Sequence, residues 1–392
     1  MITFESVTKR YPDGTVAVDD LDLEVPAGKT VVLVGPSGCG KTTSLRMINR
    51  LVEPSSGRIL LDGTDIRDRN PAQLRRGIGY VIQQTGLFPH RTVEDNIATV
   101  PVLTGLSRKK ARDRARELLT LVGLDATLAK RYPHQLSGGQ QQRVGVARAL
   151  AADPPVLLMD EPFSAVDPVV RASLQDQLLS LQAELRKTIV LVTHDIEEAI
   201  KVGDLVALFR PHGKIAQLAP PDELLASPVD DYVAGFVGFD RGIRRLSFVS
   251  TADLPLGTGP VLAADTTVVK ARTAGEPWLL VTEDGTGRPL GWVDTARLAA
   301  LPDGGTLGSL APDGIGHSFT AGTDSLRAAL DAAVLSPAGQ AVAVDGDGRV
   351  LGVASFDQLR AAIHAASRAS EGRASAGAGQ ASAGDAGGGP RP

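Results

Sequence analysis

Hydrophobic positions from Met1 to about Gly238 follow two alternating patterns. Short apolar runs rich in β-branched residues, at 29–35, 155–159 and 189–193, predict buried strands. The segments between them repeat their apolar positions with the helical period, as at 42–50, and residues 93–131 predict a mostly helical insertion. Buried strands that alternate with helices indicate an α/β domain with a largely parallel sheet over residues 1–238.

The pattern changes after this domain, where residues 239–259 predict a linker and residues 260–368 contain an internal repeat. Asp284–Gly291 matches Asp345–Gly352, with every identity displaced by 61 positions (352 − 291 = 61). Each copy predicts two strands joined by a turn, at 278–281 and 291–293 and again at 341–344 and 352–354, followed by a helix. The helix expected at 325–334 has no clear counterpart in the first copy. We therefore expect a tandem α+β domain.

Residues 369–392 consist mainly of Ala, Gly, Ser and Pro. Such a stretch has too few large apolar groups to offset the entropy lost on ordering. We expect a disordered tail, and an inert tail is favoured over a functional one.

The residues after the first buried strand have the spacing of a phosphate-binding loop, with Gly40, Lys41 and Thr42 at its end. Backbone N–H groups of such a strand-to-helix turn surround phosphates, Lys41 reaches the outer phosphates, and the Thr42 hydroxyl can ligate Mg²⁺. The full spacing disfavours the alternative, a glycine-rich turn with a surface lysine. The candidate nucleotide-binding residues of this loop are Gly35, Ser37, Gly38, Cys39, Gly40, Lys41, Thr42 and Thr43.

A second buried strand ends at Asp160 and Glu161. The carboxyl ends of parallel strands meet at one edge of the sheet, so both carboxylates are expected beside the phosphate loop. Asp160 is a candidate Mg²⁺ ligand, and Glu161 is a candidate base that orients and deprotonates the attacking water. Solvated charges at a strand end are the alternative, which the preceding phosphate loop makes less favourable.

Composition narrows the possible partners and compartments. The 392 residues fit two or three domains, and 43% hydrophobic residues suffice for their cores. A net charge of −4 argues against a nucleic-acid partner. The single cysteine, Cys39, fits a reducing compartment, and its place beside Lys41 at a helix start predicts a lowered thiol pKa. No apolar run approaches the roughly 18 residues of a membrane span, and no secretory leader is expected.

The segment Leu136–Arg143, taken with the phosphate loop and the two carboxylates, resembles the signature of the ATP-binding-cassette (ABC) ATPases over about residues 1–240. The resemblance implies a P-loop NTPase core with a helical subdomain, and a head-to-tail homodimer that holds two ATP molecules. In such a dimer the signature caps the γ-phosphate held by the other subunit, through Ser137, Gly138, Gly139 and Gln140.

The same resemblance assigns roles to residues outside these motifs. Tyr11 would stack on adenine, Gln83 would contact Mg²⁺ and the water, and His194 would be the switch histidine. Asp167 closes the D-loop, residues 164–167, in which Val166 replaces the more usual leucine. Taken alone, Tyr11 would more often be a packing residue and His194 an ordinary surface or core histidine.

Segments 80–90, 94–97, 133–137, 159–163 and 193–195 resemble the ATPase subunits of quaternary-ammonium importers, which take up glycine betaine, choline, carnitine or proline betaine. The resemblance implies a peripheral protein at the cytoplasmic face of the cell (inner) membrane. Its partners would be two integral-membrane permease subunits and, through them, an extracytoplasmic solute-binding protein. The alternatives are an importer ATPase for another small polar solute or a soluble ABC ATPase, which would need a coiled-coil insertion or a second cassette.

The tandem repeat resembles a pair of CBS (cystathionine-β-synthase-type) modules, which usually act as regulatory sensors. Nucleotide-binding copies place an aspartate three residues after a Ser or Thr that follows the second strand. Here Gln358 follows Ser355 at that distance, and Arg297 follows Asp294. We therefore expect a module that does not bind AMP or ATP through ribose; an extension that only dimerises is the alternative.

Overall fold

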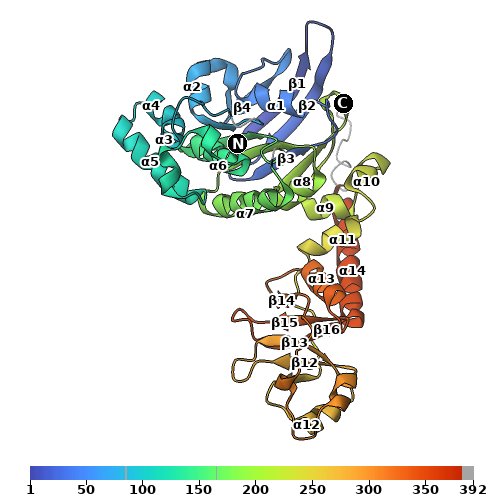
Figure 1. Ribbon diagram of the computed structural model, residues 1–392. Coiled ribbons are helices and arrows are strands. Elements are labelled where there is room, and N and C mark those ends of the chain that lie inside the picture. The colour runs from blue at the N-terminus through green and yellow to red at the C-terminus, as the bar shows by residue number, and fades with distance from the viewer. Residues whose placement is uncertain (84–85, 165, 382–392) are drawn as a thin grey trace, which may run out of the picture. The chain divides into compact units, whose positions relative to one another are not determined.

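The computed structural model describes residues 1–83, 86–164 and 166–381, which form two compact units (Figure 1). The first unit comprises Met1–Leu224 and Pro228–Gly238, and the second comprises Leu225–Ser227 and the chain from Phe239 onward. Gln84 and Thr85 of the segment 80–90, Ala165 of the D-loop and residues 382–392 of the expected tail lie outside the described residues.

A six-stranded sheet with the order β10-β9-β3-β8-β7-β6 forms the centre of the first unit. Five neighbouring strands run parallel and β10 pairs antiparallel with β9, so the expected α/β fold with a largely parallel sheet is confirmed. Its strands are β3 (Thr30–Val34), β6 (Ile78–Val81), β7 (Val156–Asp160), β8 (Thr188–Thr193), β9 (Leu205–Phe209) and β10 (Ile215–Ala219).

The strands β3, β7 and β8 are buried along their whole length, because helices cover both faces of a parallel sheet. This explains why their sequences are continuous apolar runs without alternation. The helices of this part of the unit are α1 (Lys41–Ile48), α2 (Pro71–Arg76), α6 (Gly138–Leu150), α7 (Pro168–Leu185), α8 (Ile196–Val202), α9 (Pro221–Ala226) and α10 (Asp231–Val237).

A second sheet of four antiparallel strands has the order β2-β1-β4-β5. Its strands are β1 (Ile2–Arg10), β2 (Val16–Val25), β4 (Ser56–Leu61) and β5 (Thr64–Asp65). Ile2, Phe4, Leu21 and Ile59 on its inner face join the same buried cluster as residues of β3 and α1. One face of this sheet therefore completes the core around the phosphate loop.

The expected helical insertion is present as α3 (Val93–Ile97), α4 (Thr99–Leu103) and α5 (Arg108–Leu121), which gather at one end of the first unit (Figure 1). Side chains at the N-caps define where helices begin: Thr92 accepts from Asp95 N and Ser107 accepts from Lys110 N. No helix in the described ranges is long and apolar enough to cross a membrane.

The second unit contains two three-stranded sheets with the same plan, β11-β12-β13 and β14-β15-β16. In each sheet the first pair of strands is parallel and the second pair is antiparallel. The strands are β11 (Val261–Ala263), β12 (Trp278–Thr282), β13 (Pro289–Asp294), β14 (Ser318–Thr320), β15 (Gln340–Val344) and β16 (Val350–Ser355). The expected strands of both copies are thus present.

A helix stands between the first two strands of each copy. The second copy has α13 (Leu326–Leu335), as expected, and the first has α12 (Val268–Arg272), which is half as long. The expected lack of a counterpart was therefore wrong: five residues are too short for a clear helical period in the sequence. After the third strand, the first copy has only a 3₁₀ turn (Thr295–Ala300) and the second has α14 (Phe356–Ala381).

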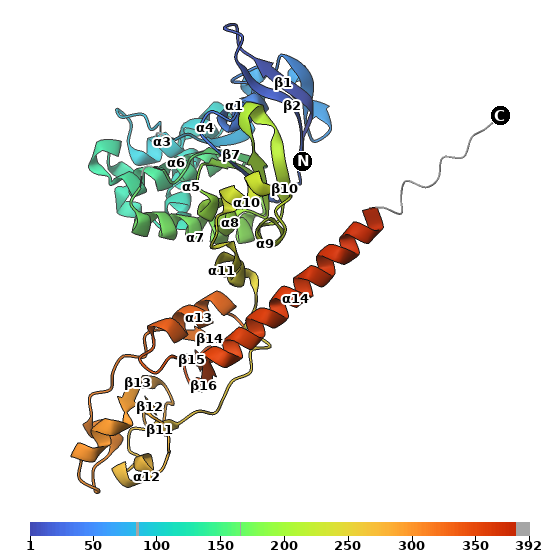
Figure 2. The ribbon, with the colours of Figure 1, turned by 90° about the vertical axis from the view of Figure 1, so that its right-hand side faces the viewer.

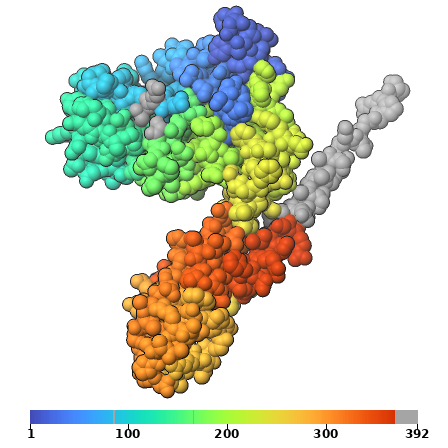
Figure 3. Space-filling view, turned by 45° about the vertical axis from the view of Figure 1, so that its right-hand side comes forward, coloured from blue at the N-terminus to red at the C-terminus, as the bar shows by residue number. Residues whose placement is uncertain are grey.

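The sheet of each copy also pairs with a residue from the segment that precedes the other copy. Gly257, ahead of the first copy, pairs antiparallel with Val353 of β16, and Asp313, ahead of the second, pairs antiparallel with Trp292 of β13. A separate buried cluster joins the two sheets, made of Leu280, Trp292, Val342, Val344 and Val353. Figure 3 shows the two copies as one continuous body.

Two expectations at the ends of this unit were wrong. Residues 239–259 are not a plain linker: they contain α11 (Arg241–Arg245) and a 3₁₀ turn, and Leu246 and Leu254 are buried against α13. The expected tail begins later, because α14 continues to Ala381 (Figure 2). Alanine has the highest helix propensity, and extending a formed helix avoids the cost of nucleation.

Candidate functional site

The parallel register brings four candidate segments to one edge of the central sheet. Val34 of β3 is level with Thr193 of β8, Val192 is level with Asp160 of β7, and Met159 is level with Val81 of β6. The residues that follow these strand ends are the phosphate loop, His194, Glu161 and Gln83. Segments distant in sequence therefore meet because parallel strands end at the same edge.

The phosphate loop needs glycine where the backbone passes closest to its neighbours. Gly40 has φ 100°, and a Cβ there would collide with the Ala17 carbonyl oxygen. Gly35 has φ 151°, and its Cβ would lie 2.7 Å from the Phe209 carbonyl oxygen. Ser37 and Gly38 lie at the exposed tip, whereas Thr43 is half-buried in the first turn of α1. The loop is thus held against β2 and β9 with its tip open.

Lys41 begins α1 and is buried, with 5% of its surface exposed. Its Nζ donates hydrogen bonds to the carbonyl oxygens of Gly35 (2.7 Å) and Pro36 (2.8 Å). The ammonium group is therefore held inside the curve of the loop, where it can contribute its charge to a bound phosphate.

Thr42 and Asp160 form a pair of oxygen ligands. The Thr42 hydroxyl donates to Asp160 Oδ1 at 2.9 Å, and Asp160 is 3% exposed. The described ranges contain no group of three or more His, Cys, Asp or Glu side chains that could hold a metal ion. Mg²⁺ fits such a pair all the same, because it usually takes one or two protein oxygens and completes its shell with phosphate and water.

Two side chains beside Asp160 were not predicted from the sequence to act here. Arg46 on α1 places its guanidinium 3.6 Å from Asp160 Oδ2. Tyr80 on β6 is half-buried; burial raises its pKa and the negative charge of Asp160 adds to the shift. The helical position of Arg46, four residues after Thr42, is the signal that could have placed it on the same face of α1.

Glu161, Gln83 and His194 form a connected group. Gln83 Nε2 donates to Glu161 Oε2 at 2.8 Å, and His194 Nδ1 lies 3.3 Å from Glu161 Oε1. Glu161 has φ 47°, an unusual backbone conformation for a residue other than glycine, and its N–H donates to Val192 O at 2.9 Å. The backbone bond to β8 fixes the turn that directs this carboxylate at the other two side chains.

A buried network lies directly behind His194. Thr193 Oγ1 donates to Glu198 Oε2 at 2.6 Å and accepts from Asp195 N at 3.0 Å. Glu198 is 4% exposed, and its burial raises its pKa. Arg171 of α7 places Nε 3.7 Å from Glu198 Oε1 and an Nη atom 3.8 Å from Asp195 Oδ2. No motif in the sequence indicated this network.

The expected lowering of the Cys39 pKa is contradicted. Burial raises the pKa of this thiol, and the attraction of the nearby Lys41 charge offsets this only in part. Cys39 is 2% exposed and belongs to the main core cluster of the first unit. Its side chain therefore points away from the open side of the loop, which sequence spacing alone could not show.

The signature residues use their polar atoms to begin α6. Ser137 Oγ accepts from Gln140 N (3.3 Å) and Gln140 Oε1 accepts from Ser137 N (3.0 Å), which is a capping box. Ser137 and Gly138 are exposed. A Cβ on Gly139 would lie 2.6 Å from Val170 Cγ1, so α6 begins directly against the first turn of α7.

The remaining two predicted residues lie at exposed turns. Asp167 caps α7 by accepting from Val169 N and Val170 N at 3.1 and 3.0 Å. Tyr11 is 36% exposed at the end of β1, with Lys9 Nζ 5.2 Å from its ring centre. An exposed ring is free to stack on a planar ligand, but no contact places Tyr11 in the group around Glu161.

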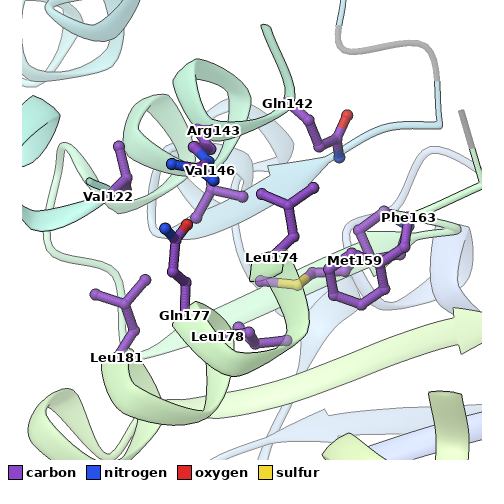
Figure 4. A pocket seen from close by; sticks show the side chains of 11 residues that line it. Val122, Gln142, Arg143, Val146, Met159, Phe163, Leu174, Gln177, Leu178 and Leu181 are labelled. Atoms are coloured by element: carbon purple, nitrogen blue, oxygen red, sulfur yellow. The ribbon is translucent and has the colours of Figure 1, made fainter. Parts of the chain in front are cut away.

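The described part of the first unit also has hollows away from this group. One lies between α6 and α7 and is lined mainly by apolar side chains, including Val146, Met159 and Leu174 (Figure 4). Gln142 also lines it, and its buried Nε2 has no hydrogen-bond partner among the described residues. Arg143 also lines it, but its Nη atoms donate to Gly123 O at 3.2 Å and to Ser173 Oγ at 3.3 Å, so the hollow belongs to the packing of α6 on α7.

Another hollow is an open groove on the helical part, with about 1070 Å³ of free space. Phe88, Val102 and Leu103 expose 39%, 36% and 56% of their surface in its lining. Arg91 stacks over the Phe88 ring at 4.9 Å. The buried Asn96 amide fixes this region, accepting from Phe88 N at 2.7 Å and donating to Phe88 O at 3.1 Å.

Comparison with known proteins relates most of the chain to one family. The sequence profile of the ABC transporter family matches residues 18–164. The osmoprotectant import ATP-binding protein OsmV of Salmonella typhimurium is 45% identical over 372 residues, covering 92% of this chain and 95% of that protein. The choline transport ATP-binding protein OpuBA of Bacillus subtilis is 50% identical over 273 residues, covering 69% of this chain and 71% of that protein.

A solved structure agrees with these relatives. A dimeric ATP-binding cassette in a post-hydrolysis state, bound to ADP and Pi, has a TM-score of 0.52 and 35% identity, covering 56% of this chain and 99% of that one. The likeness covers the length of one cassette, which is the part that carries the phosphate loop, the carboxylates and the signature. The chain belongs to the ABC transporter family, as one of its ATP-binding proteins.

Proposed function

We propose that this protein is the ATP-hydrolysing subunit of an importer for quaternary-ammonium compatible solutes such as glycine betaine, choline, carnitine or proline betaine. The observation that carries the ATPase assignment is the group of Glu161, Gln83 and His194 beside the phosphate loop. The names of the related proteins, which refer to osmoprotectant import and choline transport, support the solute class.

The hydrolytic step is assigned to this group of three. Glu161 Oε1 and Oε2 are held by two neighbours, so its carboxylate is oriented to accept a proton from the attacking water. Gln83 positions that water together with Glu161, and His194 donates to the developing charge on the phosphate. Lys41 and the loop N–H groups hold the outer phosphates, and Tyr11 stacks on adenine.

Mg²⁺ fits the pair formed by Thr42 and Asp160, with Gln83 as a further oxygen ligand. When bound, the ion neutralises phosphate charge during transfer. Arg46, whose guanidinium lies 3.6 Å from Asp160 Oδ2, balances the charge of this carboxylate.

The working form is a head-to-tail homodimer with two ATP molecules at its interface. The exposed Ser137 and Gly138, with Gly139 and Gln140, complete the site of the opposite subunit, and Asp167 supports this contact by fixing the start of α7. The dimeric state of the related cassette supports this arrangement.

The membrane partners are two permease subunits, which contact an extracytoplasmic solute-binding protein. We assign permease docking to the groove at Phe88, Val102 and Leu103, because exposed apolar groups that line a groove are typical of a docking site. Gln83 lies five residues before Phe88, so movement at the groove can reach the catalytic group. The protein is then peripheral at the cytoplasmic face of the membrane.

The second unit is assigned to regulation as a CBS-like pair. Its ribose positions are occupied by internal contacts: Gln358 Oε1 accepts from Ser355 N at 2.8 Å, and Arg297 pairs with Asp313 at 3.3 Å. These contacts support the expectation that the unit does not bind AMP or ATP through ribose.

Transport in reconstituted membranes tests the whole proposal. Vesicles with this ATPase, its cognate permease and its binding protein should take up a quaternary amine only with ATP supplied on the side of the ATPase. Lys41→Ala is the matched control, because it removes the phosphate-loop ammonium and should abolish uptake. Uptake of a sugar with no response to betaine or choline would contradict the solute class and leave the ATPase assignment intact.

A further inference from the structure

The loop that carries His194 is fixed through the Thr193 hydroxyl, which bonds both to the buried Glu198 carboxylate and to the backbone after the histidine. Before the histidine, Thr193 Oγ1 donates to Glu198 Oε2 at 2.6 Å; after it, Asp195 N donates to the same Thr193 hydroxyl at 3.0 Å. Asp195 Oδ1 also caps α8 by accepting from Glu197 N at 2.8 Å. His194 is thus held through its neighbours in sequence, while its own ring remains 58% exposed.

Arg171 is the part of this network that comes from another element. From α7 it reaches Glu198 at 3.7 Å and Asp195 at 3.8 Å, and an Nη atom donates to the carbonyl oxygen of Val166 in the D-loop at 3.4 Å. One guanidinium therefore contacts the loop before α7 and the loop that carries His194.

The residues beside Arg171 contact the signature helix on the other side. Val170 lies against Gly139, and Ser173 Oγ accepts from Arg143 of α6 at 3.3 Å. The first turns of α7 therefore connect the signature, which completes the opposite subunit's site in the proposed dimer, with His194 of this subunit's site.

We propose that Arg171 is a positioning residue for ATP hydrolysis, which acts through Glu198 and Asp195 to hold the His194 loop in register with the D-loop and the signature helix. The inference rests on the proposed role of His194 in hydrolysis. Arg171 touches neither nucleotide nor water in this assignment.

A purely structural role fits the chemistry of Glu198 poorly. Glutamine has the same size and would accept the Thr193 hydrogen bond without the cost of burying a charge. Burial raises the pKa of Glu198, and the charge of Asp195 raises it further. The charges of Arg171 and His194 act in the opposite direction and lower it. Because the folded pKa is raised, ionised Glu198 lowers stability above that pKa, and this penalty disappears below the unfolded pKa. The carboxylate is therefore kept at a cost in stability.

Steady-state phosphate release by the full chain, with unfolding midpoints measured alongside, tests the proposal. Arg171→Gln and Glu198→Gln should each lower kcat about tenfold and leave KM for ATP within about twofold, because a displaced His194 affects the reaction more than binding. The unfolding midpoint of Glu198→Gln should not fall at neutral pH. Arg171→Lys should retain an intermediate kcat, since one ammonium cannot reach both carboxylates.

The double variant separates coupling from independent damage. Arg171→Gln combined with Glu198→Gln should be no slower than the slower single variant, because both remove the same link. Lys201→Gln is the matched control, because it breaks another ion pair between α7 and α8. In that pair Lys201, seven residues after His194, lies 2.8 Å from Asp176. That variant should keep the full kcat.

Several outcomes would overturn the inference. These are multiplicative losses in the double variant, an equal loss in Lys201→Gln, or a fall in the unfolding midpoint of Glu198→Gln that parallels its fall in kcat. His194→Gln separates the proposed role of His194 in hydrolysis from the positioning role of Arg171. If it keeps full turnover, the proposed role of His194 fails and the inference fails with it. If it abolishes turnover while the Arg171 and Glu198 variants keep normal rates, only the positioning role fails.

Discussion

Polar side chains at strand ends contact different partners in the two units. In the first unit, Gln83, Glu161 and His194 follow three different strands and contact one another. In the second unit, Asp294 ends β13 and accepts from Ala296 N at 2.9 Å, and Ser355 ends β16 and accepts from Gln358 N at 3.3 Å. The side chains of the first unit are available for chemistry. Those of the second unit cap the turn and the helix that follow them in sequence.

The difference shows why position along a strand is not enough to define a site. Side chains of the second unit stand at corresponding places in both repeats, but their hydrogen-bonding groups are used by neighbouring backbone. A ligand there would have to replace existing bonds. In the first unit, bonds between side chains can be exchanged for bonds to water and phosphate.

Glu161→Gln should give the largest effect. The amide keeps the size of the carboxylate but is a far poorer base, so we expect turnover to fall about 10²- to 10³-fold with ATP affinity nearly unchanged. Phosphate release and equilibrium nucleotide binding measure the two quantities. If the variant turned over at the normal rate, Glu161 would have no catalytic role and the contrast between the two units would disappear.

Cys39 should react slowly with maleimide, although it lies inside the phosphate loop. Burial raises its pKa, so at neutral pH it holds less thiolate than an exposed thiol, and the Sγ atom is also shielded. We expect labelling about tenfold slower than that of glutathione, with a rise in rate only at higher pH or in denaturant. Rapid labelling that Mg-ATP suppresses would instead show that the thiol faces the nucleotide.

Asp294→Ala should give the smallest effect. Removing this cap should lower the stability of the second unit by about 1 kcal/mol, and Asp294→Asn, which can still cap, should lower it less. Thermal unfolding measures the difference, and ATP turnover should be the same in both variants. A loss of nucleotide binding specific to Asp294→Ala would mean that this carboxylate binds a ligand after all.

Local patterns in the sequence predicted the parts of the site that depend on spacing. One rule about strand ends placed the phosphate loop after β3 beside Asp160 and Glu161 at the end of β7, and the resemblance to the ABC ATPases added His194 after β8. The Arg171–Glu198 contact joins residues of two helices 27 positions apart (198 − 171 = 27), and no local spacing encodes such a pair. The prediction of a lowered pKa for Cys39 was wrong for a related reason, because the burial of this thiol depends on β2, β9 and α1 together.

The repeat shows the same difference between features that local sequence specifies and features that depend on distant contacts. Turn residues and alternating apolar positions predicted the strands of both copies, because hairpins are specified locally. The burial of Leu246 and Leu254 was missed because it depends on contact with α13, about 80 residues later in the chain. The length of α14 was not predicted, because the small-residue composition after residue 369 was interpreted without regard to the helix that begins at Phe356.

The exchange of strand segments between the two copies has a consequence for how this chain can evolve. Gly257 completes the sheet of the second copy and Asp313 completes that of the first, so neither copy has a finished edge when it stands alone. Deleting one copy would expose Trp292 or Val353 and leave an unpaired strand. Each copy therefore depends on the other for its fold, so a deletion or a transfer to another protein has to include both copies.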